Sequence, residues 1–140
     1  MYNNTITVFN FAQGKWYPSV IEGADLLVHA QATQTTHGTI NAGTVEIIVH
    51  CTKDKVVKTT EGGKLYLEPK VYAKDPSGHI TFKPETDFIY SGAWENLSPI
   101  NDDDYDSGFY NEANRLYDGV YQITGCGYYS LLPHFEIGAK

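Results

Sequence analysis

The C-terminal stretch Asp118-Gly-Val-Tyr-Gln-Ile-Thr-Gly-Cys-Gly-Tyr-Tyr-Ser-Leu-Leu-Pro-His-Phe-Glu-Ile137 decides the fold class. Two extended runs, 120–124 and 130–137, predict two strands, and the Gly-Cys-Gly sequence at 125–127 predicts a bend between them. A terminal segment this rich in apolar and aromatic side chains has to pair with other strands or be covered by a partner. We therefore expect a β protein whose last strands lie in its core.

Further strands are expected upstream, where β-branched or alternating segments end at turn signals. They are predicted at 5–11, 24–33, 44–51, 64–72, 79–82 and 87–90. The alternation is cleanest at 44–51, where Val45, Ile47, Val49 and Cys51 share one face. Residues 16–20 contain Pro18, which cannot donate to a ladder, so an edge segment or an aromatic-bearing loop is expected there and not a central strand.

Surface loops and one helix complete the predicted elements. The polar residues 34–43 and the residues 53–64, rich in lysine, threonine and glycine, are expected to be loops. Phe109, Ala113 and Leu116 fall at helical spacing, which predicts a helix over 107–117. The expected fold is mainly β: a small β-barrel or sandwich of six to eight short strands with one short α-helix near the C-terminus.

The composition bounds the class of protein. With 140 residues, 41% hydrophobic and 19% charged, a single folded domain over 1–140 is expected. The net charge of −7 and a single arginine, Arg115, argue against specific nucleic-acid binding. No signal-peptide pattern opens the chain, and no apolar run approaches the roughly 18 to 20 residues that span a bilayer, so a cytoplasmic protein without membrane contact is expected.

Chemistry-bearing residues form no motif of catalytic strength. Asp102, Asp104 and Asp106 have the spacing of a calcium loop, but Ser107 stands where that loop needs glycine and Ala113 where it needs glutamate. A solvated acidic helix start, or an acidic patch that meets a basic partner, is the preferred interpretation. No metal and no cofactor are expected.

The histidines and cysteines do not show the spacing of a metal or nucleophile site. His50 and Cys51 are adjacent in a predicted strand and so face opposite sides, and His134 is expected opposite Phe135. Cys51 and Cys126 are expected to be free thiols, as in most cytosolic proteins. Gly125 to Gly127 is not followed by a helix, so we interpret it as a bulge or corner and not as a phosphate cradle.

Aromatic residues are abundant, with 11 Tyr, 6 Phe and 2 Trp. Core and interface packing is the favoured use of these rings, with a small-molecule pocket as the alternative. The aromatic candidates are Trp16, Tyr17, Trp94, Tyr105, Phe109, Tyr110 and Tyr128.

The order of segments resembles a group of small minor capsid or head-tail connection (head-closure) proteins encoded by tailed phages and prophages of Gram-positive bacteria. The segments are TITVFNF at 5–11, WYPSVIEGADL at 16–26, GTVEIIVHC at 43–51, ITF at 80–82, DFIYSGAW at 87–94, DYDSGFYNEAN at 104–114, DGVYQITG at 118–125 and LLPHFEIGAK at 131–140. The likeness spans nearly the whole chain, although residues 53–72 do not align to it.

The resemblance implies a non-enzymatic subunit that sits between portal and tail, with other phage structural proteins as partners and a homo-oligomeric ring on assembly. It implies localisation in the virion after synthesis in the cytoplasm. The residues assigned to an assembly interface are Trp16, Tyr17, Trp94, Asp102, Asp104 and Asp106. The loops at 34–43 and 53–64 are expected to order on assembly.

Two alternatives from other classes stay open. One is a small-molecule-binding β-barrel of a bacterial cytosol, which would enclose a pocket lined by tyrosines. The other is a metal-dependent hydrolase built on His29, His50 or His134.

Overall fold

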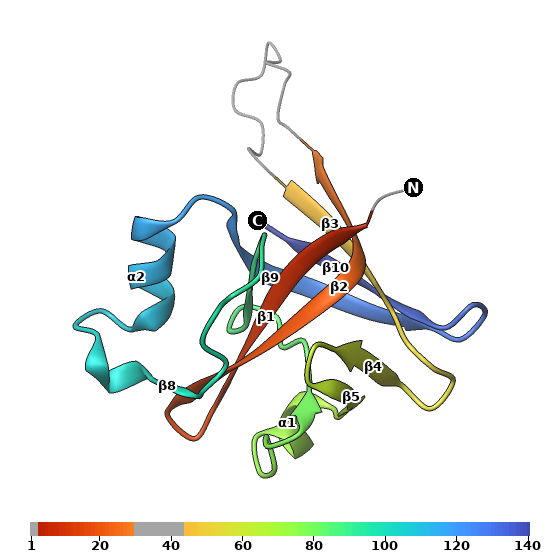
Figure 1. The fold of residues 1–140 in the computed structure, drawn as a ribbon, viewed down its shortest axis with the longest axis horizontal. Helices are drawn as coiled ribbons and strands as arrows, with labels where there is room; N and C mark the ends of the chain where they lie inside the picture. Colours follow the sequence, from red (N-terminus) through yellow and green to blue (C-terminus); the bar gives the residue numbers. More distant parts are fainter. Residues whose placement is uncertain (1–2, 30–43) are drawn as a thin grey trace.

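Six antiparallel strands close into a barrel (Figure 1). The computed structural model describes residues 3–29 and 44–140. The barrel order is β1-β7-β9-β10-β3-β2, and β2 returns to pair with β1. Its strands are β1 (Asn4–Ala12), β2 (Lys15–His29), β3 (Thr44–His50), β7 (Phe88–Tyr90), β9 (Val120–Tyr129) and β10 (His134–Ala139). The predicted mainly-β fold is confirmed, and of barrel and sandwich the chain adopts the barrel.

The remaining elements are short. They are β4 (Val56–Thr59), β5 (Gly62–Tyr66), α1 (Pro69–Tyr72), β6 (His79–Ile80), β8 (Ile100–Asn101), the 3-10 helix η1 (Asp102–Asp104) and α2 (Phe109–Leu116). Strand β8 pairs with the start of β2, while β4, β5 and β6 form a second, three-stranded sheet. None of the helices in the described ranges is long and apolar enough to cross a membrane.

Two long strands bend so that the barrel can close. Strand β2 pairs first with β1 and then with β3, and the β1–β2 ladder has a one-residue register shift between Ile21 and Ala24, beside Gly23. Gly23 has φ +79°, a conformation that side-chain-bearing residues rarely adopt, so glycine permits the corner. Strand β9 changes partner from β7 to β10 in the same way, with a register shift beside Thr124.

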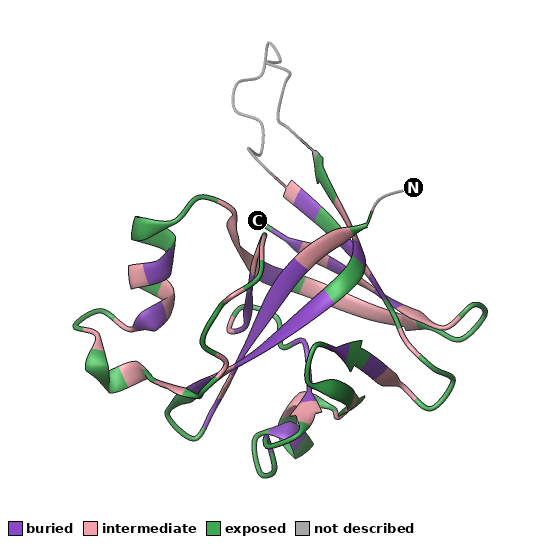
Figure 2. Cartoon of the chain, viewed as in Figure 1, coloured by how far each residue is buried: buried purple, intermediate pink, exposed green. Residues whose placement is uncertain are grey.

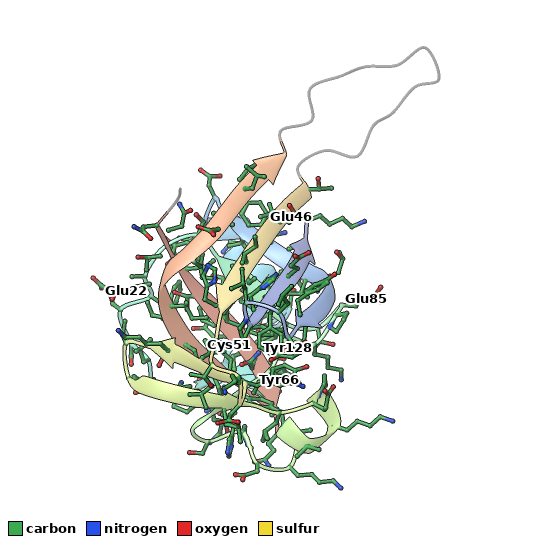
Figure 3. The ribbon with its side chains drawn as sticks, turned by 90° about the vertical axis from the view of Figure 1, so that its right-hand side faces the viewer. Glu22, Glu46, Cys51, Tyr66, Glu85 and Tyr128 are labelled. Carbon is green, nitrogen blue, oxygen red and sulfur yellow. The ribbon has the colours of Figure 1, made fainter. Side chains whose placement is uncertain are left out.

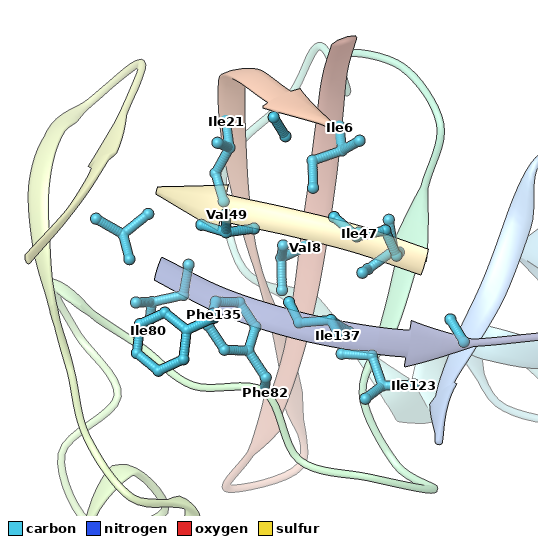
Figure 4. Close-up of a cluster of buried hydrophobic side chains, with 14 of the residues drawn as sticks. Ile6, Val8, Ile21, Ile47, Val49, Ile80, Phe82, Ile123, Phe135 and Ile137 are labelled. Atoms are coloured by element: carbon cyan, nitrogen blue, oxygen red, sulfur yellow. The ribbon is translucent and has the colours of Figure 1, made fainter. Parts of the chain in front are cut away.

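The barrel interior is filled by aliphatic and aromatic side chains (Figure 4). Alternate residues of β3 and β10 point inward, so Ile47, Val49, Phe135 and Ile137 are each at most 1% exposed. The inward face predicted for 44–51 is confirmed. The same alternation places His134 on the opposite side from Phe135, as expected.

The second sheet covers one end of the barrel, below the strands in Figure 1. Its buried side chains Val57 and Ile80, with Phe82 just beyond β6, join the barrel core. The prediction of a surface loop at 53–64 is therefore wrong. This segment is a hairpin, because pairing with β5 and the burial of Val57 and Thr59 outweigh its polar composition.

Residues 64–72 are also not one broken strand. Strand β5 ends at Tyr66, and Pro69 opens the short helix α1. Proline suits the first turn of a helix because its missing N–H would have no partner there. The loop predicted at 34–43 and the end of the strand predicted at 24–33 lie outside the described residues.

The C-terminal stretch forms a hairpin, but its turn is not at the glycines. Strand β9 runs unbroken through Gly125 and Gly127, so the predicted bend at 125–127 is wrong. The turn lies at 130–133, and β10 begins only at His134. The bulge beside Thr124 agrees with a corner near the glycines.

Pro18 lies within a strand, opposite Phe9 of β1, so the alternative of an aromatic-bearing loop is wrong. At this position β2 has a ladder on one side, because its pairing with β8 ends at Trp16 and its pairing with β3 begins at Asp25. Pro18 therefore occupies a local edge, where a missing N–H is tolerated.

Candidate interaction surfaces

Helix α2 lies against the side of the barrel over a second buried cluster, which is aromatic. Figure 2 shows its buried positions on one side and its exposed positions on the other. Phe109 and Ala113 are buried, as the predicted helix requires, but Leu116 is 52% exposed and does not share their face. Phe9 and Phe88 stack with ring centroids 4.7 Å apart beneath the helix.

Asp102 joins this cluster to the start of α2. Its Oδ1 accepts hydrogen bonds from Trp16 Nε1 and from the Phe109 backbone N–H, both at 2.8 Å. The second bond satisfies an amide that is free in the first turn of the helix. Asp102 and Trp16, both assigned to an interface from the sequence, are thus brought together, and Trp16 is only 5% exposed.

Trp94 is the third assigned residue in this region and is partly buried. Its ring stands nearly perpendicular to four neighbours, Phe9, Phe109, Tyr90 and Tyr117, at centroid distances of 5.2 to 5.8 Å. Trp94 therefore anchors the chain after β7 to the barrel and leaves its outer side on the surface.

The other assigned residues lie apart from this cluster. Tyr17 points away from it, since successive strand residues alternate, and lines a groove of about 310 Å³ with Lys64 and His79. Asp104 and Asp106 precede α2 and are exposed, and they line one groove together with Arg115 of the last helical turn. The sequence-based interface is therefore divided over three surfaces.

His50 and His134 are neighbours on the outer face of β3 and β10, with ring centroids 6.5 Å apart. His50 Nε2 lies 3.6 Å from Asp25 Oδ2. Nδ1 of His134 contacts the Leu132 carbonyl at 2.7 Å, and its Nε2 contacts Glu136 Oε2 at 3.0 Å. These acceptors favour the imidazolium form, so the pKa of His134 is raised above its usual value, first by the Leu132 carbonyl and then by Glu136.

The turn beside these histidines exposes two large apolar side chains that sequence reasoning assigned to a strand. Leu131 is 85% exposed and Leu132 is 81% exposed. Leu132 has φ +53°, an uncommon conformation for a bulky residue. Leu132 and Pro133 line one side of a groove of about 420 Å³, whose other lining residues are Asp25, Ile48, His50, Cys51 and His134.

Tyr66 and Tyr128 lie where the second sheet joins the barrel, near Cys51 (Figure 3). Lys55 Nζ lies 4.6 Å from the ring centroid of Tyr128 and 5.9 Å from that of Tyr66. Cys51 and Cys126 are both free. Burial raises the pKa of each thiol, that of Cys126 to about 12, which is the opposite of what a nucleophile needs.

Asp87, the residue before β7, is 1% exposed. It accepts hydrogen bonds from the Phe11 and Lys83 amides, at 3.0 and 2.9 Å, and from Asn10 Nδ2 at 2.8 Å. Burial raises the pKa of Asp87 to about 6, although these hydrogen bonds lower it in part. The carboxylate ties β1 to the segment before β7.

No group of three or more His, Cys, Asp or Glu side chains in the described residues is arranged to hold a metal ion. The pair formed by His50 and His134 is therefore not supplemented by a third ligand in this part of the chain. His29, the third histidine of the hydrolase alternative, ends β2, and its side chain is not among those described.

Comparison with known proteins gives one family. The chain matches, over residues 1–140, the "Family of unknown function (DUF6751)". The chain belongs to this family. No curated protein shows significant similarity to the sequence. No solved structure shows significant similarity either.

Proposed function

We propose that this chain is a non-enzymatic structural protein of phage or prophage particles, a minor capsid or head-tail connector subunit that works by binding other particle proteins. The observation that carries the binding role is the turn between β9 and β10. It presents Leu131 and Leu132 to solvent, and in Figure 1 its hairpin projects from the barrel on the side opposite α2. The phage context rests on the resemblance of the segments along the chain.

Because they are exposed, the side chains of Leu131 and Leu132 do not contribute to the hydrophobic core. Fully burying a leucine side chain in an interface contributes about 1.5 to 3 kcal/mol. Leu132 also holds a backbone conformation that costs stability for a branched side chain. Leu132 thus combines an exposed apolar side chain with an uncommon backbone conformation, which supports the proposed contact with a partner.

The groove beside the turn supplies a complementary surface. Ile48 and Pro133 give it an apolar lining, and Asp25 adds a carboxylate to that lining. A partner segment that inserts an apolar residue here would cover the leucines at the same time. Neighbouring subunits or another particle protein are the partners we propose, with a ring as the assembled form.

The ligand-binding alternative receives less support. The barrel interior, where a small β-barrel would hold a ligand, is occupied by fully buried side chains such as Val8, Ile47 and Ile137. The grooves described above lie on the surface.

The test is genetic complementation in the bacterium that carries the gene. The gene is deleted, the prophage is induced, and particles are counted by plaque assay and examined by electron microscopy. We expect heads without joined tails, and rescue by the wild-type gene. Normal particle yield without the gene would overturn the phage assignment.

A second arm tests the turn itself. A Leu131→Asp and Leu132→Asp double variant should fold, with unchanged circular dichroism, and should fail to rescue assembly. A Val71→Asp variant is the matched control, since Val71 is also an exposed apolar residue, at 53%, but lies on α1 away from the turn. Rescue by the double variant would show that the turn is not the binding surface.

A further inference from the structure

Three aromatic rings line a groove of about 400 Å³ next to the C-terminal end of α2. The rings belong to Tyr90, Trp94 and Tyr117. Their centroids are separated by similar distances: 5.7 Å for Tyr90 and Trp94, 5.6 Å for Trp94 and Tyr117, and 5.9 Å for the two tyrosines. The planes cross at 87°, 82° and 67°. The three rings are therefore steeply inclined to one another at similar spacing.

Each ring belongs to a different part of the fold, so the arrangement of the three rings is set before any ligand binds. Tyr90 ends β7, and Tyr117 follows α2, where its N–H donates to the Ala113 carbonyl at 2.9 Å. The backbone N–H of Trp94 donates to Thr7 Oγ1 at 3.0 Å, and the same hydroxyl donates to the Gly92 carbonyl at 2.7 Å. Thr7 is fully buried, so the loop that carries Trp94 is attached to the barrel wall.

The groove favours positive charge. Its remaining lining residues are Ala93, Glu95 and Asn96, so one carboxylate and no cationic side chain line it. The chain as a whole carries a net charge of −7. Aromatic ring faces attract a cation within about 6 Å of the centroid, most strongly for tryptophan. An organic cation in this groove would meet three rings and a carboxylate together.

We propose that Tyr90, Trp94 and Tyr117 form an aromatic site for an organic cation, a methylated ammonium group or a guanidinium, with Glu95 as the charge partner. The site is distinct from the leucine turn and does not rest on the proposed assembly role. The cation is held by the π faces of the rings and by the Glu95 carboxylate. A neutral group of the same shape lacks both attractions and binds more weakly.

The experiment is an NMR titration that follows the indole N–H signals. The chain has two tryptophans, and Trp16 is buried and hydrogen-bonded to Asp102, so its signal serves as an internal reference. The probes are choline, N-acetylarginine amide, and 3,3-dimethylbutan-1-ol, the neutral isostere of choline. We expect saturable shifts of the Trp94 signal with at least one cation and at least about fivefold weaker binding of the isostere. The stronger cation identifies the preferred class.

Matched variants locate the site. Tyr117→Leu should weaken cation binding by at least about threefold. Tyr129→Leu is its control, because Tyr129 has a similar exposed fraction, 48% against 43% for Tyr117. Tyr129 lies away from the groove, in the β9–β10 hairpin, where it stacks on His134. Glu95→Gln should also weaken binding, whereas Glu22→Gln, an exposed carboxylate on β2, should not.

Several results would overturn the proposal: no saturable shift with either cation through the millimolar range, equal affinity for choline and its isostere, or equal loss of binding in Tyr117→Leu and Tyr129→Leu. Failure here would leave the particle-assembly role untouched, since that role is tested through Leu131 and Leu132. Failure of rescue experiments would likewise leave the cation titration valid.

Discussion

Asp102 is the residue whose role differs most from that of its neighbours in the acidic run. One of its oxygens serves both Trp16 of β2 and the first amide of α2, while Asp104 is exposed. Asp102→Ala would leave both donors without this partner. We expect the free energy of unfolding to fall by about 2 to 3 kcal/mol, because hydrogen bonds to a charged acceptor contribute more than neutral ones. Urea denaturation measures the change.

The control for this prediction is Asp104→Ala. It removes a carboxylate of the same run without removing a helix contact, so its effect should stay within about 0.5 kcal/mol. Equal effects of the two substitutions would contradict the role assigned to Asp102.

Asp87 makes stability depend on pH. Its pKa is about 6 in the folded protein against an ordinary aspartate value of 3.8, so the folded state holds the proton more tightly. Its contribution to stability is greatest below about pH 4, falls as the pH rises through 4 to 6, and is level above that range. The full change is about 3 kcal/mol, from roughly 1.4 kcal/mol per pKa unit.

The measurement compares the wild type with Asp87→Asn over this pH range. The amide presents N–H groups where Asp87 accepts bonds from Asn10 and Lys83, so the variant is less stable throughout. The advantage of the wild type over the variant should nevertheless change with pH: the difference in unfolding free energy shrinks as the pH rises from 4 to 6. A constant difference would show that Asp87 does not titrate in this window.

The β9–β10 hairpin carries a pH response of its own. Protonated His134 donates to both Leu132 and Glu136, which raises its pKa above the usual 6.5. The stabilisation from these two contacts is complete below about pH 6.5. It is lost as the pH rises through the higher pKa that His134 has in the folded protein. The Cys51 amide, which donates to the Pro133 carbonyl, should be better protected from hydrogen exchange at low pH once intrinsic rates are corrected.

His134→Gln is the variant that checks this response. Glutamine does not gain a proton, so the pH dependence of Cys51 protection should disappear while the hairpin still forms. An unchanged dependence in the variant would place the titrating group elsewhere.

The second sheet acts as a cover for the barrel. Phe82 contacts Tyr66 and Phe135 with ring centroids 5.8 and 5.1 Å away and is 1% exposed. Phe82→Ala should lower the unfolding free energy by about 3 to 5 kcal/mol, because a cavity opens at the barrel end. Val71→Ala, on the exposed side of α1, should change it by less than about 0.5 kcal/mol. A small effect at Phe82 would show that the sheet covers the barrel loosely.

For the whole molecule, the barrel closes only when its last strand is present, because β10 joins β9 to β3. A chain ending at Thr124 loses β10 and half of β9. We expect it to be insoluble or to lack a cooperative thermal transition. As a control, Asn-Gly in place of residues 130–133 removes the leucine turn but keeps both strands, and this variant should fold. A soluble, cooperatively melting truncation would contradict the closed barrel.

Local pattern was enough to predict the class of fold. Alternation of Val45, Ile47 and Val49 requires a sheet with one face on a core, and helical spacing of Phe109 and Ala113 requires a helix against the same body. These features depend on neighbours in sequence, so the sequence contains them directly. The same holds for the acidic residue before α2, since free amides at a helix start attract carboxylates.

Contacts between distant segments decided the rest. Residues 53–64 were predicted as a loop because polar residues surround the buried positions Val57 and Thr59. The turn was predicted at the glycines because flexible residues often mark turns, whereas pairing with β10 keeps β9 continuous through them. Of the interface residues assigned from the sequence, Trp16, Trp94 and Asp102 lie in one region. No local signal in the sequence indicated the other two rings of the aromatic groove, Tyr90 and Tyr117.

The sequence by itself determined that the chain forms strands, which faces are apolar, and where the late helix lies, because side-chain periodicity is a property of each segment. Only the tertiary structure decided that the strands close into a barrel, that Leu131 and Leu132 remain exposed, and that three rings meet around one groove. The physical reason is that closure, exposure and ring geometry depend on which segments become neighbours, and no single segment specifies its neighbours.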